Sequence, residues 1–232
     1  MWAVGEFSVN ITNSEYERLN SLSTCLLCDA MAELDILEGG VLSSNIKPIF
    51  ITKKLIGVAY TVKAPFGNSF PVHYAIYNAR KGYVLVVDTE QYSQGPYLGE
   101  LMVLTAKNMG LNGLIIDGYV RDYEELIKID FPIFAKGCIP TKPGKKREGS
   151  VNCPISCGNI CINPGDVIVC DSDGILSIPR QYLDIILYKA EIKKATDDLR
   201  KEKIEDFFKD NLYNNLNKDI SILMPKDIKD NL

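Results

Sequence analysis

The sequence predicts a mixed α/β fold in which alternating helices and strands give way to a strand-rich second half. Up to about residue 130, apolar stripes at helical spacing alternate with short apolar runs such as residues 83–88 and 113–117. From Pro132 onward the apolar runs are short and are separated by turn residues such as Pro164-Gly165-Asp166. This order favours a layered sandwich over a simple doubly wound sheet.

The first half contains eight expected elements. Helices are predicted by apolar residues at helical spacing over 14–34, 72–79, 98–109 and about 122–129. Strands are predicted by β-branched or continuous apolar runs over 49–52, 55–63, 83–88 and 113–117. Ser14 is the expected start of the first helix. Gly110 is the expected stop of the third, because glycine readily adopts the left-handed conformation that ends helices.

The second half contains short strands and then a change in composition. Strands are expected over 133–135, 151–154, 160–162, 166–170 and 175–178. Residues 191–232 hold 19 charged side chains in 42 residues, although an apolar stripe continues from Leu183 to Phe207. We therefore expect a core over residues 1–180 and a charged helical extension over 181–232 that packs on a neighbouring subunit and is ragged after Asn211.

The composition is that of an ordinary globular protein, with 46% hydrophobic and 24% charged residues and a formal net charge of −4. Nucleic acid is not an expected partner, because binding it normally requires a basic face. No apolar run is long enough to span a bilayer, and residues 1–10 lack the features of a secretory signal. Seven cysteines, an odd number, argue against a disulfide framework. We expect a cytoplasmic protein with no membrane partner.

The strand predicted over 113–117 is followed closely by adjacent opposite charges, Arg121 and Asp122. Ligands of open α/β sheets bind outside the carboxyl ends of the strands, so this position suggests a site. Asp122 could bind a divalent cation, and Arg121 could bind a carboxylate or an enolate oxygen. Alternatively, Asp122 is only the N-cap of the next helix and Arg121 is solvated. The spacing alone favours this second interpretation.

A second candidate is the start of the helix predicted over 98–109, where the chain reads Gly99-Glu100-Leu101-Met102. The first amides of a helix have no intrahelical acceptor, and Gly99 lets a ligand approach the backbone. The alternative is an ordinary helix start with Glu100 favourably placed against the helix dipole. Taken with the charged pair, this segment predicts one pocket that holds an anion, a guanidinium and a metal-binding carboxylate.

His73 is the only histidine, which excludes a histidine-based triad or a multi-histidine metal site. Any metal must be bound mainly through oxygen, and this favours Mg²⁺ or Mn²⁺ over structural zinc. His73 itself is expected on a helix face. Lys142, Lys145, Lys146 and Arg147 form a basic loop that could meet an anionic substrate or could simply be solvated.

Several segments resemble the signature of the RraA-like family. The likeness rests on segments in the family's order: 98–102, 113–122 (GLIIDGYVRD), 131–135, 151–158, 163–166 and 171–174. This family contains the 4-hydroxy-4-methyl-2-oxoglutarate aldolases, which are also oxaloacetate decarboxylases, and the regulator of ribonuclease E activity A. The resemblance implies a swivelling β/β/α three-layer sandwich, here with a C-terminal helical extension. It also implies homotrimers or hexamers with sites at subunit boundaries.

Carried over by position, the resemblance implies a role for each candidate residue. Arg121 would contact the pyruvyl group and stabilise its enolate, and Asp122 would bind the divalent metal directly. The amides of residues 99–102 would hold the carboxylate of the 2-oxo acid, with Glu100 also reaching the water shell of the metal. Asp197 is the best match to an acid that the aldolase branch draws from the C-terminal helix of a neighbouring subunit.

The resemblance implies a metal-dependent lyase that cleaves a C–C bond of a small 2-oxo acid through a pyruvate enolate. The reaction would be a retro-aldol cleavage or the decarboxylation of oxaloacetate. The alternative is a non-catalytic regulator that binds and inhibits a ribonuclease. The charged helix after Gln181 favours the enzyme, because the regulatory branch tends to lack it. At residues 89–91 this chain reads Thr-Glu-Gln where the family tends to have glycines, so the substrate preference stays open.

Overall fold

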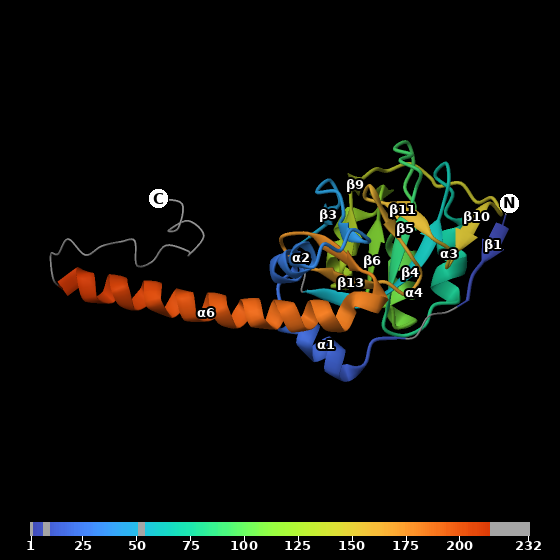
Figure 1. The fold of residues 1–232 in the computed structure, drawn as a ribbon. Coiled ribbons are helices and arrows are strands. Elements are labelled where there is room, and N and C mark those ends of the chain that lie inside the picture. Colours follow the sequence, from blue (N-terminus) through green and yellow to red (C-terminus); the bar gives the residue numbers. More distant parts are fainter. Residues whose placement is uncertain (1, 7–9, 51–53, 214–232) are drawn as a thin grey trace.

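The computed structural model describes residues 2–6, 10–50 and 54–213. Its centre is a ten-stranded sheet whose main path runs in the order β2-β14-β13-β4-β5-β6-β8-β3 (Figure 1). The bounds along this path are Gly40–Val41 (β2), Ile175–Ile178 (β14), Val167–Cys170 (β13), Leu55–Lys63 (β4), Tyr83–Asp88 (β5), Gly113–Ile116 (β6), Ile133–Ala135 (β8) and Lys47–Pro48 (β3). β10 (Gly149–Val151) pairs with β4, and β1 (Trp2–Val4) pairs with β10.

Helices and two small sheets complete the fold. The helices are α1 (Asn13–Asn20), α2 (Thr24–Glu33), α3 (Phe70–Tyr77), α4 (Glu100–Asn108), α5 (Tyr123–Ile129) and α6 (Leu183–Tyr213), with a 3₁₀ turn at Arg180–Tyr182. The small sheets pair β7 (Tyr119–Val120) with β9 (Gly137–Cys138) and β11 (Ile155–Cys157) with β12 (Ile160–Ile162). None of the described helices is both long enough and apolar enough to cross a membrane.

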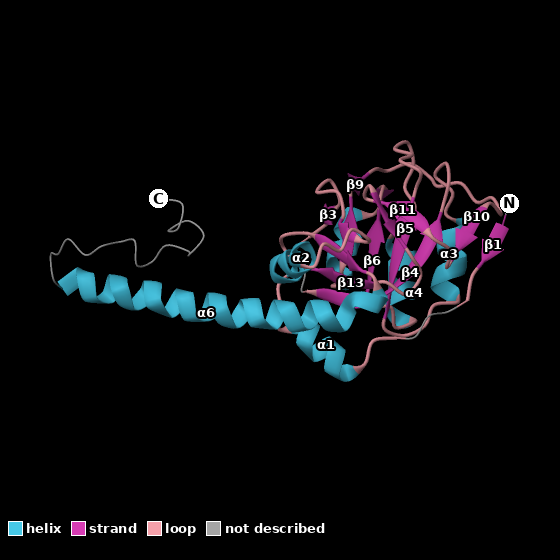
Figure 2. Ribbon diagram, viewed as in Figure 1, coloured by secondary structure: helices cyan, strands magenta, loops and turns pink. Residues whose placement is uncertain are grey.

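Alternation along the central strands separates the molecule into three layers, as the sequence motifs implied. On β5, Leu85 and Val87 pack with α3 and α4, whereas Val84 and Val86 pack with the β11–β12 hairpin. On β13, Val167 packs with α2 and α6. Helices therefore cover one face of the sheet and the β hairpin covers the other, which confirms the expected β/β/α sandwich (Figure 2).

The strands β4, β5, β6 and β8 pair in parallel, so their carboxyl ends lie at the same edge of the sheet. The segments that leave β5 and β6 at this edge lead into α4 and toward α5. Pro96 and Tyr119 form a parallel bridge, and the amide of Tyr97 donates to Tyr119 O at 2.9 Å. This bridging brings together the two segments that carry the predicted site residues.

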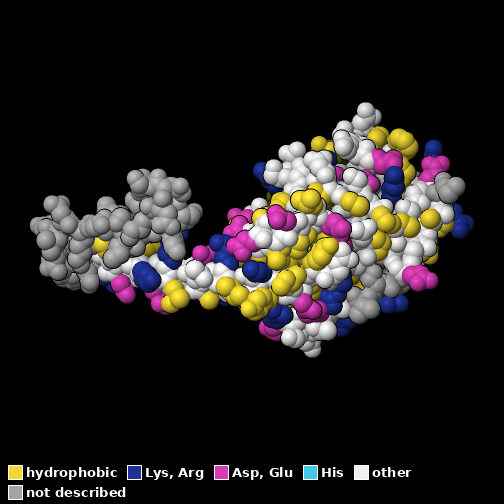
Figure 3. Space-filling view, viewed as in Figure 1, with side chains coloured by type: hydrophobic (Ala, Val, Ile, Leu, Met, Phe, Trp, Pro, Cys, Tyr) yellow, Lys and Arg dark blue, Asp and Glu magenta, His cyan; other side chains and the backbone are white. Residues whose placement is uncertain are grey.

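Helix α6 begins inside the helical layer and then projects beyond it (Figure 1). Its first turns bury Leu183, Ile186, Leu187 and Ala190 in a cluster shared with α2. Farther along, Ile192 and Leu199 are exposed. Figure 3 shows hydrophobic side chains on the surface of this helix. The helix continues to Tyr213, past the start of the expected ragged tail at Asn211, and residues 214–232 lie outside the described part.

Two predicted boundaries at the N-terminal end are wrong because of local capping. The expected helix over 14–34 is two helices, since the Ser23 side chain accepts the amide of Leu26 at 3.2 Å and starts α2 anew. The first helix begins after Thr12 and not at Ser14. Thr12 and Glu15 cap each other's amides there in a capping box.

Two predicted strands are also placed differently. Of the strand expected over 151–154, only Val151 lies in a strand, at the end of β10, and residues 152–154 connect β10 to β11. Asn152 adopts a left-handed backbone with φ 56°, and Pro154 cannot donate to a ladder. The strand expected over 49–52 is shifted to β3, which ends at Pro48, and residues 51–53 lie outside the described chain.

Candidate functional site

Asp122 occupies the position before α5, but its carboxylate binds a different helix. Its backbone is left-handed, with φ 65° and ψ 41°, and its side chain makes no capping bond to α5. Instead, Asp122 Oδ2 accepts a hydrogen bond from the amide of Glu100 at 3.1 Å. Asp122 is thus the N-cap residue of α5, as the alternative interpretation expected, but its side chain does not provide the cap. It caps α4 from a backbone conformation that non-glycine residues adopt only at a cost.

Gly99 is required by this contact. A Cβ atom at Gly99 would overlap with the Asp122 carboxylate and would lie 2.9 Å from Arg121 Cγ. The φ of Gly99 is −144°, an extended value that any residue adopts. The requirement is therefore for space beside the carboxylate and not for backbone freedom.

Arg121 lies beside the same carboxylate. Its Nε atom is 3.3 Å from both carboxylate oxygens of Asp122, and its amide donates to Leu98 O at 3.0 Å. About a third of the side chain, 37%, is exposed. No partner within the described part of the chain contacts its two terminal nitrogens. These nitrogens are available to a ligand.

These residues line one pocket with a volume of about 270 Å³. The lining residues are His73, Gly99, Leu101, Met102, Arg121, Asp122, Lys142, Pro143 and Lys145. The structure thus brings the start of α4 together with the charged pair, in the arrangement that the sequence suggested. The pocket combines a helix N-terminus, a guanidinium and a carboxylate.

The amides at the start of α4 are not equally free. The amide of Glu100 already donates to Asp122, and that of Met102 turns back to Gly99 O at 3.1 Å. The amide of Leu101 has no acceptor among the described residues. A carboxylate bound here would meet Leu101 first, with the helix dipole behind it.

Two predicted site residues do not line the pocket in this chain. The Glu100 side chain lies near enough to Lys128 to influence its pKa, and Glu100 is absent from the lining. Asp197 lies on the later turns of α6, with its side chain 49% exposed and 3.5 Å from Lys193 Nζ. Within one chain, Asp197 does not take part in the pocket.

The pocket is also lined by residues that the sequence analysis named but did not place in it. His73 comes from α3, and Lys142, Pro143 and Lys145 come from the loop after β9. Burial lowers the pKa of His73, and the charge of Lys145 lowers it further, so both favour the neutral imidazole. The basic run was the only sequence signal for this side of the pocket.

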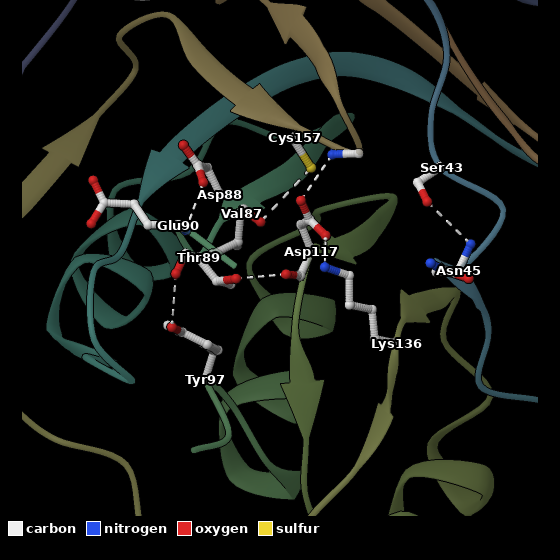
Figure 4. A network of polar contacts seen from close by, with 11 residues as sticks. Ser43, Asn45, Val87, Asp88, Thr89, Glu90, Tyr97, Asp117, Lys136 and Cys157 are labelled. Atoms are coloured by element: carbon white, nitrogen blue, oxygen red, sulfur yellow. Dashed lines mark hydrogen bonds and ion pairs between the residues drawn. The ribbon is translucent and has the colours of Figure 1, made fainter. Parts of the chain in front are cut away.

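A second polar network lies at the ends of β5 and β6 (Figure 4). Asp117 forms an ion pair with Lys136 at 2.5 Å and accepts the amide of Gly158 at 2.9 Å. Asp88 accepts the amide of Ser156 at 3.3 Å, and burial raises the pKa of this carboxyl. Both acids hold the β11–β12 hairpin against the sheet. They are structural and do not belong to the pocket.

Residues 89–91, where this chain reads Thr-Glu-Gln, pass through this network. Glu90 and Gln91 both have positive φ, 51° and 60°. Glycine adopts this backbone region without steric cost, so it is the residue that such positions favour. Glu90 also forms an ion pair with Lys63 at 2.8 Å. A Cβ at Gly118 would lie 2.9 Å from Thr89 Cγ2, so Gly118 provides space for the Thr89 side chain.

The donor atoms fit a hard divalent cation. Asp122 is the only carboxylate that lines the pocket, and the described residues contain no group of three or more His, Cys, Asp or Glu side chains that could enclose a metal. Structural zinc needs four protein ligands, whereas Mg²⁺ is commonly bound by one or two carboxylates with water and substrate oxygens. The pocket therefore suits a cation that is bound jointly with a substrate.

The chain belongs to the RraA-like family, because residues 24–177 match the family model described as Aldolase/RraA. This confirms the resemblance seen in the sequence motifs. A protein of Halalkalibacterium halodurans named "Putative 4-hydroxy-4-methyl-2-oxoglutarate aldolase" is 36% identical over 173 residues, which are 74% of this chain and 82% of that protein.

Solved structures show the same fold. Streptomyces coelicolor RraAS2, described as an unusual member of the RNase ES inhibitor RraA protein family, matches with a TM-score of 0.75 at 23% identity over 83% of this chain and 98% of its own. The RNA-processing inhibitor RraA from Thermus thermophilis matches with a TM-score of 0.59 at 26% identity over 66% of this chain and 92% of its own. The chain is therefore similar in sequence to relatives named as putative aldolases and in fold to structures described as RraA inhibitors.

Proposed function

We propose that the protein is a divalent-metal-dependent lyase that cleaves a C–C bond of a small 2-oxo acid. The reaction is the retro-aldol cleavage of a 4-hydroxy-4-methyl-2-oxoglutarate type of substrate, the decarboxylation of oxaloacetate, or both. The observation that carries this proposal is the position of Arg121, Asp122 and the free Leu101 amide around one pocket. The name of the Halalkalibacterium halodurans relative supports the same class of enzyme.

The start of α4 binds and orients the substrate. The carboxylate of the 2-oxo acid accepts from the Leu101 amide at the positive end of the helix dipole, and Gly99 leaves room for it. Asp122, fixed by the Glu100 amide, would hold Mg²⁺ or Mn²⁺ together with water and substrate oxygens. When bound, the cation supplies a Lewis acid that withdraws electrons from the 2-oxo group.

Arg121 stabilises the charge that develops on the substrate. Cleavage of the C3–C4 bond leaves its electron pair on C3, and conjugation moves the negative charge to the enolate oxygen. The other product is CO₂ from oxaloacetate, or a second pyruvate from 4-hydroxy-4-methyl-2-oxoglutarate, whose 4-hydroxyl group gives up its proton to a base as the bond breaks. The terminal nitrogens of Arg121 donate to that oxygen, while its Nε stays beside Asp122 at 3.3 Å. A proton then returns to C3 to complete pyruvate.

The acid–base group comes from a second subunit. Asp197 is exposed on α6 and lies outside the pocket of its own chain, so it can serve only the pocket of another copy in a homotrimer or hexamer. Glu100, whose side chain is also outside the lining, assists through the surrounding water. This arrangement uses the charged extension that distinguishes the chain.

Pyruvate formation from oxaloacetate and from 4-hydroxy-4-methyl-2-oxoglutarate, with and without Mg²⁺ or Mn²⁺, tests the proposal. We expect turnover that requires the cation, and turnover that survives exhaustive EDTA treatment would contradict the metal dependence. The second candidate is ribonuclease inhibition, favoured by the likeness to the Thermus thermophilis inhibitor. Absence of turnover together with inhibition of a ribonuclease would replace the first proposal by the second.

A further inference from the structure

Helix α6 has two apolar faces at its start, and the core of its own chain covers only one of them. The first turns bury four apolar side chains in the cluster shared with α2. Ile185 and Tyr188 belong to the same turns, but they are 42% and 56% exposed. These two side chains therefore begin a second apolar face on the outer side of the helix.

The outer face continues along the part of α6 that projects from the body. Ile192 and Leu199 are 48% and 60% exposed, and Ala195 between them is also exposed. With Ile185 and Tyr188, these residues recur at alternating steps of three and four positions. This is the spacing of the a and d positions of a coiled coil, with a at 185, 192 and 199 and d at 188 and 195. We call these five residues the α6 seam.

The α6 seam is not an extension of the face that packs on the core. In the same register, the buried residues of the first turns occupy b, c and f positions, on the opposite side of the helix. In the next two turns these positions are all charged, as Lys193, Lys194, Asp197, Arg200 and Lys201. The core-facing side thus becomes charged where the helix leaves the body, whereas the α6 seam stays apolar. A stripe that outlasts the contact with its own chain indicates a partner.

The charges beside the α6 seam indicate what this partner is. Every g position from 184 to 205 is acidic, and the e positions at 189 and 203 are lysines. In a parallel pair of identical helices, each g position faces the e position five residues later, which places Asp184 beside Lys189 and Asp198 beside Lys203 of the other copy. In an antiparallel pair, g positions face g positions, so acids would face acids. The charges therefore match a second copy of α6 in parallel orientation.

The remaining positions agree with this arrangement. Glu191, the middle g residue, forms an ion pair with Arg18 of its own chain at 2.6 Å. The e position that it would face on a second helix is Thr196, which has no charge. Two of the three a positions of the α6 seam are isoleucine, and β-branched residues at a favour two strands. The pattern is therefore that of a two-stranded coiled coil.

We propose that α6 pairs with the α6 of a second copy as a parallel two-stranded coiled coil along the α6 seam. The inference goes beyond the proposed function and does not depend on it. Asp197 occupies an f position, on the side of the helix that faces away from the α6 seam, so this contact is separate from any pocket that Asp197 serves. The coiled coil joins two chains or, where the bodies themselves assemble, two such assemblies.

The mass of the purified protein, measured by sedimentation equilibrium, tests the contact. Leu199→Asp should halve the mass and raise the dissociation constant of the pair about 100-fold, because both chains lose a buried apolar side chain. Folding of the single chain is not at risk, since Leu199 is exposed there. Phe208→Asp is the matched control, because Phe208 is also apolar and exposed on α6 but lies at a c position, away from the α6 seam. An unchanged mass in Leu199→Asp, or an equal loss in Phe208→Asp, would overturn the inference.

Charge exchange and cross-linking distinguish a parallel helix from other occupants of the α6 seam. Lys203→Glu should weaken the association about tenfold by facing Asp198 with a like charge twice in each pair, and Asp198→Lys/Lys203→Glu should restore it. Leu199→Cys should form a disulfide between copies when dioxygen is the oxidant, well above the level of wild type or Phe208→Cys, because a positions meet in a parallel pair.

The opposite results identify a different occupant. A mass that falls in Leu199→Asp without a cross-link in Leu199→Cys would mean that the α6 seam packs on the body of another subunit or on an antiparallel helix. A charge exchange that fails to restore the association would contradict the parallel register. Either result would overturn the inference.

Discussion

The carboxylate of Asp122 caps helix α4 by accepting the amide of Glu100 at 3.1 Å. The two residues are 22 positions apart in the chain and meet where the segments leaving β5 and β6 are bridged. The contact couples the proposed metal ligand, Asp122, to the start of α4, where the substrate carboxylate is proposed to bind. A change in either one should displace the other.

Asp122→Asn should separate the structural role from the chemical one. Asparagine tolerates the left-handed backbone and can still accept the Glu100 amide, but it lacks the charge that holds a cation. We expect lyase activity to fall by about 100-fold or more while the free energy of unfolding changes by less than about 1 kcal/mol. Asp122→Ala should lose activity and also about 1–3 kcal/mol of stability, through the lost cap and the strained backbone. Denaturant titration and pyruvate assays check both, and near-normal turnover of the asparagine variant would remove Asp122 from the metal site.

Gly99→Ala should inactivate the enzyme without touching a functional side chain. The added methyl would overlap with the Asp122 carboxylate and force it away from α4. We expect kcat/KM to fall by about 100-fold or more, because misplacement of a catalytic group by about 1 Å costs that much. Gly95→Ala is the control, since its nearest neighbour would be Tyr92 at 3.4 Å, an ordinary contact. Equal activity of the two variants would show that the close approach is unimportant.

Mixing two inactive variants should restore activity if Asp197 acts across a subunit boundary. Asp122→Ala and Asp197→Ala proteins are each expected to be inactive, because each lacks one part of every site. In a mixed oligomer, some sites receive an intact Asp122 pocket from one chain and an intact Asp197 from another. Refolding or subunit exchange of the mixture should recover roughly a quarter of wild-type turnover for equal proportions and random assembly. A mixture that stays inactive, although mass spectrometry finds mixed oligomers, would argue against a shared site.

The free energy of unfolding should depend on pH through Asp166, a buried carboxyl that does not line the pocket. Burial raises its pKa from the usual 3.8 to about 6, although it accepts the Asn163 amide at 2.8 Å. The folded state therefore binds the proton more tightly than the unfolded state does. This contribution to stability is complete below about pH 4 and is lost as the pH rises to about 6, by at most about 3 kcal/mol.

Asp166→Asn should remove this pH dependence. The free energy of unfolding of the variant, relative to wild type, should rise between pH 4.5 and pH 7.5, as measured by urea denaturation at several pH values. Parallel curves for the two proteins would mean that Asp166 does not titrate in this range.

Much of the fold follows from local patterns in the chain. The central strands β5, β6 and β14 were predicted within a residue, because continuous apolar runs between turns identify buried strands. Gly110 ends its helix as expected, with a φ of 86°. The break between α1 and α2 was missed, because the apolar stripe continues in phase across Ser23 and hides the cap.

The candidate site was only half predictable. Arg121, Asp122 and Gly99 were found because charges and a helix start follow strands whose carboxyl ends share an edge. Lys142 and Lys145 were named only as part of a basic loop that could meet an anionic substrate. Their place in this pocket depends on Gly144 binding Gly67, which lies 77 positions earlier in the chain. No local pattern reports a contact of that separation.

The sequence by itself determined the strands, the layers and the identity of the chemical groups, because burial periodicity and turn residues act over a few neighbouring positions. Only the tertiary structure decided that the Asp122 carboxylate turns away from α5 to cap α4, that Gly99 must make room for it, and that an anchored loop closes the pocket. Each of these depends on where packed strand ends bring distant segments together. That placement is set by the burial of the whole sheet between its two covering layers.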